Sequence, residues 1–202
     1  MSQSQSNDVQ PHSTVEADFV HHIGLPTTKV SRWLDKFVLN LGFLFAFLWI
    51  AVVVTIIVAV VGRYAFGIGS ILLEEVEWHL AGAAWLVGLS YTLVKDSHVR
   101  VDVLYERFSL RRQVWIELLG ILLLLLPFAL IVTYQSWPFF WSSYLQGEVS
   151  SSPAGLPARW AIKFFVPFSF ALIVVAAVSR LLKCTALLFG VPKPAGQDDA
   201  VR

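Results

Sequence analysis

Residues 39–61 read LNLGFLFAFLWIAVVVTIIVAVV, a run in which only Asn40 and Thr55 are notably polar. A helix needs about 20 mainly apolar residues to cross the hydrocarbon core of a bilayer. The run is continuous rather than alternating, which favours a helix over a barrel strand. It is also longer than the apolar core of a secretory signal, roughly 7–15 residues. The sequence therefore predicts a transmembrane helix that stays in the mature protein.

Three further apolar runs follow the first, and we place the spans at about 39–61, 76–94, 114–134 and 161–182. The 202-residue chain is 56% hydrophobic and only 14% charged, whereas a soluble domain keeps about 25% charged residues to cover its surface. We therefore predict an all-α integral membrane protein with a four-span domain over 29–190. Flexible cytoplasmic tails are expected at 1–28 and 191–202.

The basic residues predict the orientation of these spans. Twelve of the 15 Lys and Arg residues precede the first span, lie between the second and third, or lie in the last turn of the fourth or after it. Because cytoplasmic loops carry the excess of Lys and Arg, both termini and the central loop are expected in the cytoplasm. Most tryptophans agree, because they fall near span ends, where an amphipathic ring suits the headgroup layer; only Trp49 and Trp85 lie well within spans.

Two stretches beside the spans look amphipathic. In residues 28–37 and 103–113, apolar side chains recur every three or four residues, with basic side chains between them. Basic amphipathic segments of this kind commonly lie flat on the membrane surface. We predict short interfacial helices here. The alternative, that each stretch simply extends the adjoining span, stays open.

Few residues point to chemistry within the chain. Ionisable groups at bilayer depth are functional candidates, but Glu77, His79, Glu117 and Lys163 all lie near span ends. We interpret Glu117 as a carboxylate that reaches the cytoplasmic interface. One cysteine, Cys184, and one span histidine leave no pattern for a haem, a metal or a dithiol pair. No cofactor, no enzyme activity and no nucleic-acid partner are predicted.

Small residues recur along one side of the second span and predict a helix-packing face. Residues of this size let membrane helices approach closely. The face comprises Glu77, Ala81, Ala84, Gly88 and Thr92. The sequence leaves open whether it meets another helix of this chain or a second protein.

Several short motifs occur in a distinctive order. Gly62-Arg63-Tyr64-Ala65-Phe66-Gly67 closes the first span, Leu73-Glu74-Glu75 opens the second, and Trp85-Leu86-Val87-Gly88 lies within it. The turn that follows contains His98, Arg100 and Asp102, and Gly155-Leu156-Pro157 with Trp160 and Pro167 lead into the fourth span. In this order, over about residues 37–182, the sequence resembles the small membrane subunit of tripartite ATP-independent periplasmic (TRAP) transporters, the DctQ-like family.

The resemblance implies a scaffold subunit of a sodium-coupled system for organic acid uptake in the bacterial inner membrane. Its implied partners are a large multi-pass membrane subunit, which holds the substrate site, and a periplasmic solute-binding protein. Arg63 is expected to meet Glu74 or Glu75, and His98, Arg100 and Asp102 to clamp the cytoplasmic turn. The outer loops, 63–73 and 135–160, are expected to help dock the binding protein.

Two alternative functions are a redox membrane protein and a self-sufficient small transporter. A redox membrane protein needs axial histidines or paired cysteines, and the chain has neither. A self-sufficient small transporter needs polar residues at bilayer depth, and the predicted spans lack them.

Overall fold

The computed structural model describes residues 25–97 and 108–193, and within these ranges the chain is helical and contains no strand. The helices are α1 (Lys29–Ala46), α2 (Leu48–Phe66), α3 (Ile71–Lys95), α5 (Leu110–Gly120), the π-helical turn η2 (Ile121–Leu125), α6 (Leu126–Leu145) and α7 (Trp160–Phe189). The all-α prediction is confirmed.

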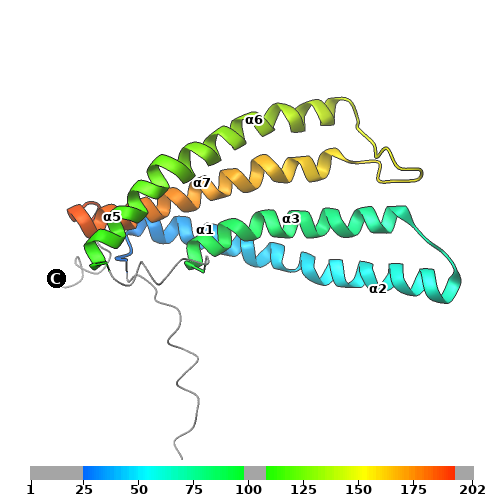
Figure 1. Cartoon of the computed structure of the whole chain (residues 1–202), viewed down its shortest axis with the longest axis horizontal. Helices are drawn as coiled ribbons and strands as arrows, with labels where there is room; N and C mark the ends of the chain where they lie inside the picture. Colours follow the sequence, from blue (N-terminus) through cyan, green and yellow to red (C-terminus); the bar gives the residue numbers. More distant parts are fainter. Residues whose placement is uncertain (1–24, 98–107, 194–202) are drawn as a thin grey trace, which may run out of the picture.

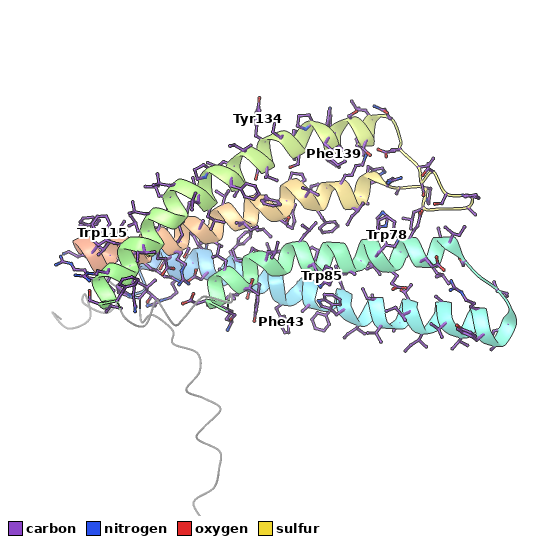
Figure 2. The ribbon with its side chains drawn as sticks, viewed as in Figure 1. Phe43, Trp78, Trp85, Trp115, Tyr134 and Phe139 are labelled. Atoms are coloured by element: carbon purple, nitrogen blue, oxygen red, sulfur yellow. The ribbon has the colours of Figure 1, made fainter. Side chains whose placement is uncertain are left out.

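The helices form an open row rather than a closed bundle. Figure 1 shows α2, α3, α7 and α6 side by side in that order, with α1 lying beside α3 and α7 at one end. We call the end that holds the α2–α3 turn and the α6–α7 loop the outer end, and the opposite end the inner end. A row leaves broad apolar faces uncovered, and large side chains cover the outside of the helices in Figure 2.

α1 and α2 form one 38-residue helical stretch with a local break at Phe47. α1 begins at a capping box, in which the Thr28 hydroxyl accepts from the Ser31 amide at 3.1 Å and the Ser31 hydroxyl accepts from the Thr28 amide at 2.9 Å. Residues 28–37 thus do not form a separate helix, which favours the alternative that this stretch extends the adjoining span. This stretch is the first part of α1, because its cap lies at Thr28 and its helix continues to Ala46.

The residues before α1 also belong to the folded part. Leu25 packs against a cluster of Val114, Leu118, Cys184 and Leu188 at the inner end. Thr28 is 1% exposed. Apolar burial of Leu25 and the helix cap at Thr28 therefore hold the last residues of the predicted tail. The rest of that tail, the second interfacial stretch up to residue 107 and residues 194–202 lie outside the described residues.

α5, η2 and α6 form a second continuous stretch, 36 residues long, over Leu110–Leu145. The π-helical turn immediately precedes Pro127. Proline has no N–H to donate to the preceding turn, and a change of helical pitch is a usual way to accommodate that loss within a membrane helix.

Three stretches are long and apolar enough to cross a membrane among the described residues: Lys29–Phe66, Leu110–Leu145 and Trp160–Phe189. α3 does not meet the same standard of hydropathy, because Glu74, Glu75, Glu77 and His79 lie in its first turns and Lys95 ends it. Its 25 residues nevertheless rise about 37 Å at 1.5 Å per residue.

Candidate functional site: two polar clusters at the ends of the helices

Glu75 is the centre of the polar cluster at the outer end. It lies in the first turns of α3, after Ser70 has capped the helix, and is only 6% exposed. Its carboxylate accepts from the Leu156 amide at 2.6 Å and from the Ser150 hydroxyl. One carboxylate on α3 thus holds two points of the loop between α6 and α7.

Gly155 shows how closely this loop approaches α3. A Cβ at Gly155 would lie 2.6 Å from Ser150 Cβ and 2.9 Å from Glu75 Oε2, so no larger residue fits without a shift of the backbone. Ala154, beside it, has a φ of +58°, a conformation that costs a non-glycine residue about 1–3 kcal/mol. The surrounding contacts therefore hold the loop in one conformation.

Glu148 ties the other side of the same loop to α7. Its carboxylate pairs with Lys163 and accepts from the Ser143 hydroxyl at 2.6 Å. Arg159 adds a longer contact, with its Nε 3.8 Å from Glu148 Oε1. The hydrogen bond from Lys163, followed by that from Ser143, holds the pKa of Glu148 below its usual 4.5.

The lowered pKa predicts how the loop responds to acid. A carboxylate with a depressed folded-state pKa contributes stability that is present above the ordinary value and is lost as the pH falls through the folded value. We therefore expect hydrogen exchange over 146–159, corrected for intrinsic rates, to be unchanged between pH 7 and pH 5 and to rise below pH 4.5. In Glu148→Gln, which cannot titrate, exchange should already be raised at pH 7. An acid response equal to that of the unmodified chain would contradict this prediction.

Arg63 and Glu74 form the ion pair expected across the α2–α3 turn. Their side chains are 53% and 50% exposed, so the pair contributes only about 0–1 kcal/mol. Of the two carboxylates considered as partners of Arg63, Glu74 takes that role, while Glu75 faces the loop. Gly67 ends α2 with a φ of +68°, which explains a glycine at this motif position.

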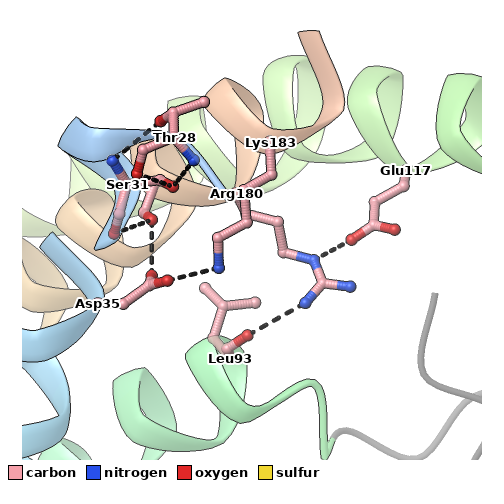
Figure 3. Close-up of polar contacts among 8 residues, drawn as sticks. Thr28, Ser31, Asp35, Leu93, Glu117, Arg180 and Lys183 are labelled. Atoms are coloured by element: carbon pink, nitrogen blue, oxygen red, sulfur yellow. Dashed lines mark hydrogen bonds and ion pairs between the residues drawn. The ribbon is translucent and has the colours of Figure 1, made fainter. Parts of the chain in front are cut away.

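Arg180 is the centre of the polar cluster at the inner end (Figure 3). It lies on α7 and is 5% exposed. Its Nε donates to Glu117 on α5, its Nη2 lies 2.7 Å from Asp96 Oδ1 after α3, and its Nη1 donates to the Leu93 carbonyl at 3.5 Å. The interpretation of Glu117 as a carboxylate reaching the interface is wrong, because its side chain is 9% exposed and paired with Arg180.

A second set of contacts joins α7 to α1 beside Arg180. Lys183 Nζ lies 2.6 Å from Asp35 Oδ2, and the Ser179 hydroxyl lies 2.6 Å from Asp35 Oδ1 and 3.1 Å from the Ser31 carbonyl. Figure 3 shows Asp35 and Lys183 next to the capping box of Thr28 and Ser31. The inner cluster therefore connects α1, α3, α5 and α7.

The predicted packing face on α3 is divided in the structure. Ala84, which is 5% exposed, lines an open groove together with Gly88 and Thr92. Glu77 instead lines a small pocket with Arg63 and Glu74. Ala81 is half-buried, and Phe66 of the motif is exposed. His98, Arg100 and Asp102 lie outside the described residues, so their predicted clamp stays a prediction.

Sequence reasoning missed Asp35, Glu148, Ser150 and Arg180 as members of these clusters. Arg180 and Lys183 were counted only as orienting charges. One signal could have found Arg180 and Lys183: both stand at the end of an apolar span, where a buried cation needs a carboxylate partner. Glu117 was the matching acid, but 63 residues separate it from Arg180.

The comparisons with known proteins bear on both clusters. Residues 52–187 match the model of the family described as tripartite ATP-independent periplasmic transporters, DctQ component. No curated protein and no solved structure matched the chain. The matched range covers more than half of the 202 residues and includes Glu75, Glu148 and Arg180. The chain therefore belongs to the DctQ family of TRAP transporter components, which are parts of a transporter and not enzymes.

Proposed function

We propose that this chain is the small scaffold subunit of a sodium-coupled TRAP transporter for organic acid uptake. It braces the large membrane subunit and presents its outer loop to the periplasmic solute-binding protein. The observation that carries the docking role is the α6–α7 loop, which Glu75 holds from α3 and Glu148 from α7. The family match supports the assignment to a TRAP system.

The lengths and polar residues of the helices support four spans with both ends in the cytoplasm. α3 rises about 37 Å, more than the roughly 30 Å of the hydrocarbon core, and its acidic residues lie in its first turns. α3 also packs between α2 and α7, which are both apolar enough to span. The Lys and Arg residues in the first half of α1, at the start of α5, and in and after the last turns of α7 favour a cytoplasmic inner end.

The inner cluster supports a bracing role. A scaffold has to keep its own helices in fixed positions while a neighbouring subunit moves. Arg180 and Asp35 join helices that are far apart in the sequence, and membrane helices otherwise associate mainly through close packing. We expect the row of helices to behave as one body for this reason.

The docking role is tested with one exposed valine at each end of the molecule. Val149, in the outer loop, is 58% exposed, and Val191, at the inner end, is 69% exposed. In liposomes that contain both membrane subunits, Val149→Glu should raise the concentration of loaded binding protein needed for half-maximal uptake. Val191→Glu should leave that concentration unchanged. If both variants and the unmodified chain needed the same concentration of loaded binding protein for half-maximal uptake, docking at this loop would be contradicted.

A further inference from the structure

The strongest feature outside the two polar clusters is an apolar groove of about 930 Å³ on the face of α3 next to the bend between α1 and α2. Its aromatic walls include Phe43, Trp49, Trp78 and Trp85. Figure 2 labels Phe43, Trp78 and Trp85, which lie along α3 and at the bend. The groove is lined almost entirely by apolar atoms, and it lies on helices that we assign to the membrane.

Trp49 and Trp85 are unusual in their depth. Trp85 lies ten residues before the end of α3, about 15 Å along the helix axis, which is half the thickness of the hydrocarbon core. Trp49 lies beside it, with ring centroids 6.0 Å apart. Tryptophan is enriched at the membrane interfaces instead. Two neighbouring indoles at mid-depth therefore need a specific reason.

The indole N–H groups supply a criterion for the occupant of the groove. Trp85 is 68% exposed and Trp49 is 39% exposed, and neither has a hydrogen-bond acceptor among the described residues. Hydrocarbon chains offer no acceptor, and a polar N–H left unpaired in the bilayer core is unfavourable. Lipid ester groups lie at the interface, too far from Trp85 to accept its proton. A protein segment can place a hydroxyl or carbonyl group at this depth.

The floor of the groove suits a helix. Gly82 and Gly88 line it, and a Cβ at Gly88 would meet no atom within 4 Å. Small residues at the bottom of a groove let a second backbone approach closely. Gly88 and Thr92 also belong to the packing face that the sequence predicted, and their place in the groove indicates that this face meets a helix outside this chain.

We propose that this groove receives a transmembrane helix of the large membrane subunit, which offers a hydrogen-bond acceptor to the indole of Trp85. The proposal rests on the proposed function, because it takes its partner from it. The groove extends along α3 from Trp78 to Thr92, so a helix seated in it contacts α3 together with the end of α1 and the start of α2. The two indoles then contact protein rather than lipid.

The test compares two glycines that both have room for a side chain. No atom lies within 4 Å of a Cβ at Gly88, in the groove, or at Gly120, at the end of α5 away from it. When the subunits are co-expressed and this chain is purified through a tag in mild detergent, Gly88→Leu should lower recovery of the large subunit about tenfold, since overpacking a close contact is strongly unfavourable. Gly120→Leu should leave recovery unchanged. Size-exclusion profiles of the variants alone check that each folds.

A second variant and a crosslink keep the proposal falsifiable if Gly88→Leu misfolds. Trp85→Phe retains the ring and removes the N–H, and it should weaken retention of the large subunit about threefold. A photoreactive amino acid at Leu89, which lines the groove, should crosslink to the large subunit. Crosslinks only to lipid, or only to a second copy of this chain, would overturn the proposal.

Failure of the groove proposal is distinguishable from failure of the proposed function. One outcome is that Gly88→Leu and Trp85→Phe recover as much of the large subunit as the unmodified chain does. In that case the groove is not the contact, and the scaffold role stands. If the unmodified chain recovers no large subunit in a detergent that preserves such complexes, both are wrong.

Discussion

Replacing Arg180 with methionine lowers the stability of the chain in detergent by about 3–5 kcal/mol, the usual cost of removing one partner from a buried ion pair. Arg180 lies between Asp96 and Glu117, whose side chains are 13% and 9% exposed. Without the guanidinium, both buried carboxylates lose the ion pair that Arg180 makes with them. Thermal unfolding followed by tryptophan fluorescence measures the change.

The control and the compensated variant separate this effect from a general loss of charge. Arg111, on the surface of α5, is exposed, and Arg111→Met should change stability little. Adding Asp96→Asn and Glu117→Gln to Arg180→Met removes the negative charges that Arg180 balanced and should restore most of the lost stability. If the triple variant were as unstable as Arg180→Met alone, buried charge would not be the cause.

Replacing Glu75 with alanine frees the outer loop and lowers binding-protein-dependent uptake. The Leu156 amide and the Ser150 hydroxyl both lose their acceptor. Hydrogen exchange of the peptide containing Leu156 should rise at least about tenfold, because hydrogen bonds to charged acceptors are the stronger ones. Uptake should fall in parallel, with a higher requirement for loaded binding protein, if the loop docks that protein.

The neighbouring carboxylate and the amide variant make this prediction specific. Glu74 is half exposed and pairs with Arg63 at the surface, so Glu74→Ala should change neither exchange nor uptake appreciably. Glu75→Gln should be milder than Glu75→Ala, because its oxygen can accept from Leu156 and its amide can donate to the Ser150 hydroxyl. Equal effects of Glu74→Ala and Glu75→Ala would contradict the role of Glu75.

The helices were predictable because each one leaves a local signal. The apolar runs at 76–94 and 161–182 lie within α3 and α7, and those at 39–61 and 114–134 lie within the continuous stretches Lys29–Phe66 and Leu110–Leu145. Crossing a bilayer imposes both length and composition, which makes such runs recognisable. The beginning of α1 was not recognised, because residues 28–37 carry the charges of a surface segment. Asp35 in fact faces Lys183 of α7. An amphipathic pattern shows that a helix has a polar side, and it does not show what that side contacts.

The polar clusters were predictable only in part, because their members are distant in sequence. Arg63 and Glu74 are 11 residues apart across one turn, and their pairing followed from the motif order. Glu75 and Leu156 are 81 residues apart, and their contact depends on α3 lying beside α7. The sequence showed a motif around Gly155 but not the reason for the glycine there. The reason is that the loop passes so close to Glu75 that a side chain has no room.

The central claim is that this chain is an indispensable non-catalytic part of a binding-protein-dependent transporter. Sodium-driven uptake of organic acids into liposomes tests it most directly, with the large subunit, this chain and the binding protein added singly and together. We predict uptake only when all three are present. Uptake by the large subunit and binding protein at the same rate without this chain, or uptake by this chain alone, would contradict the account.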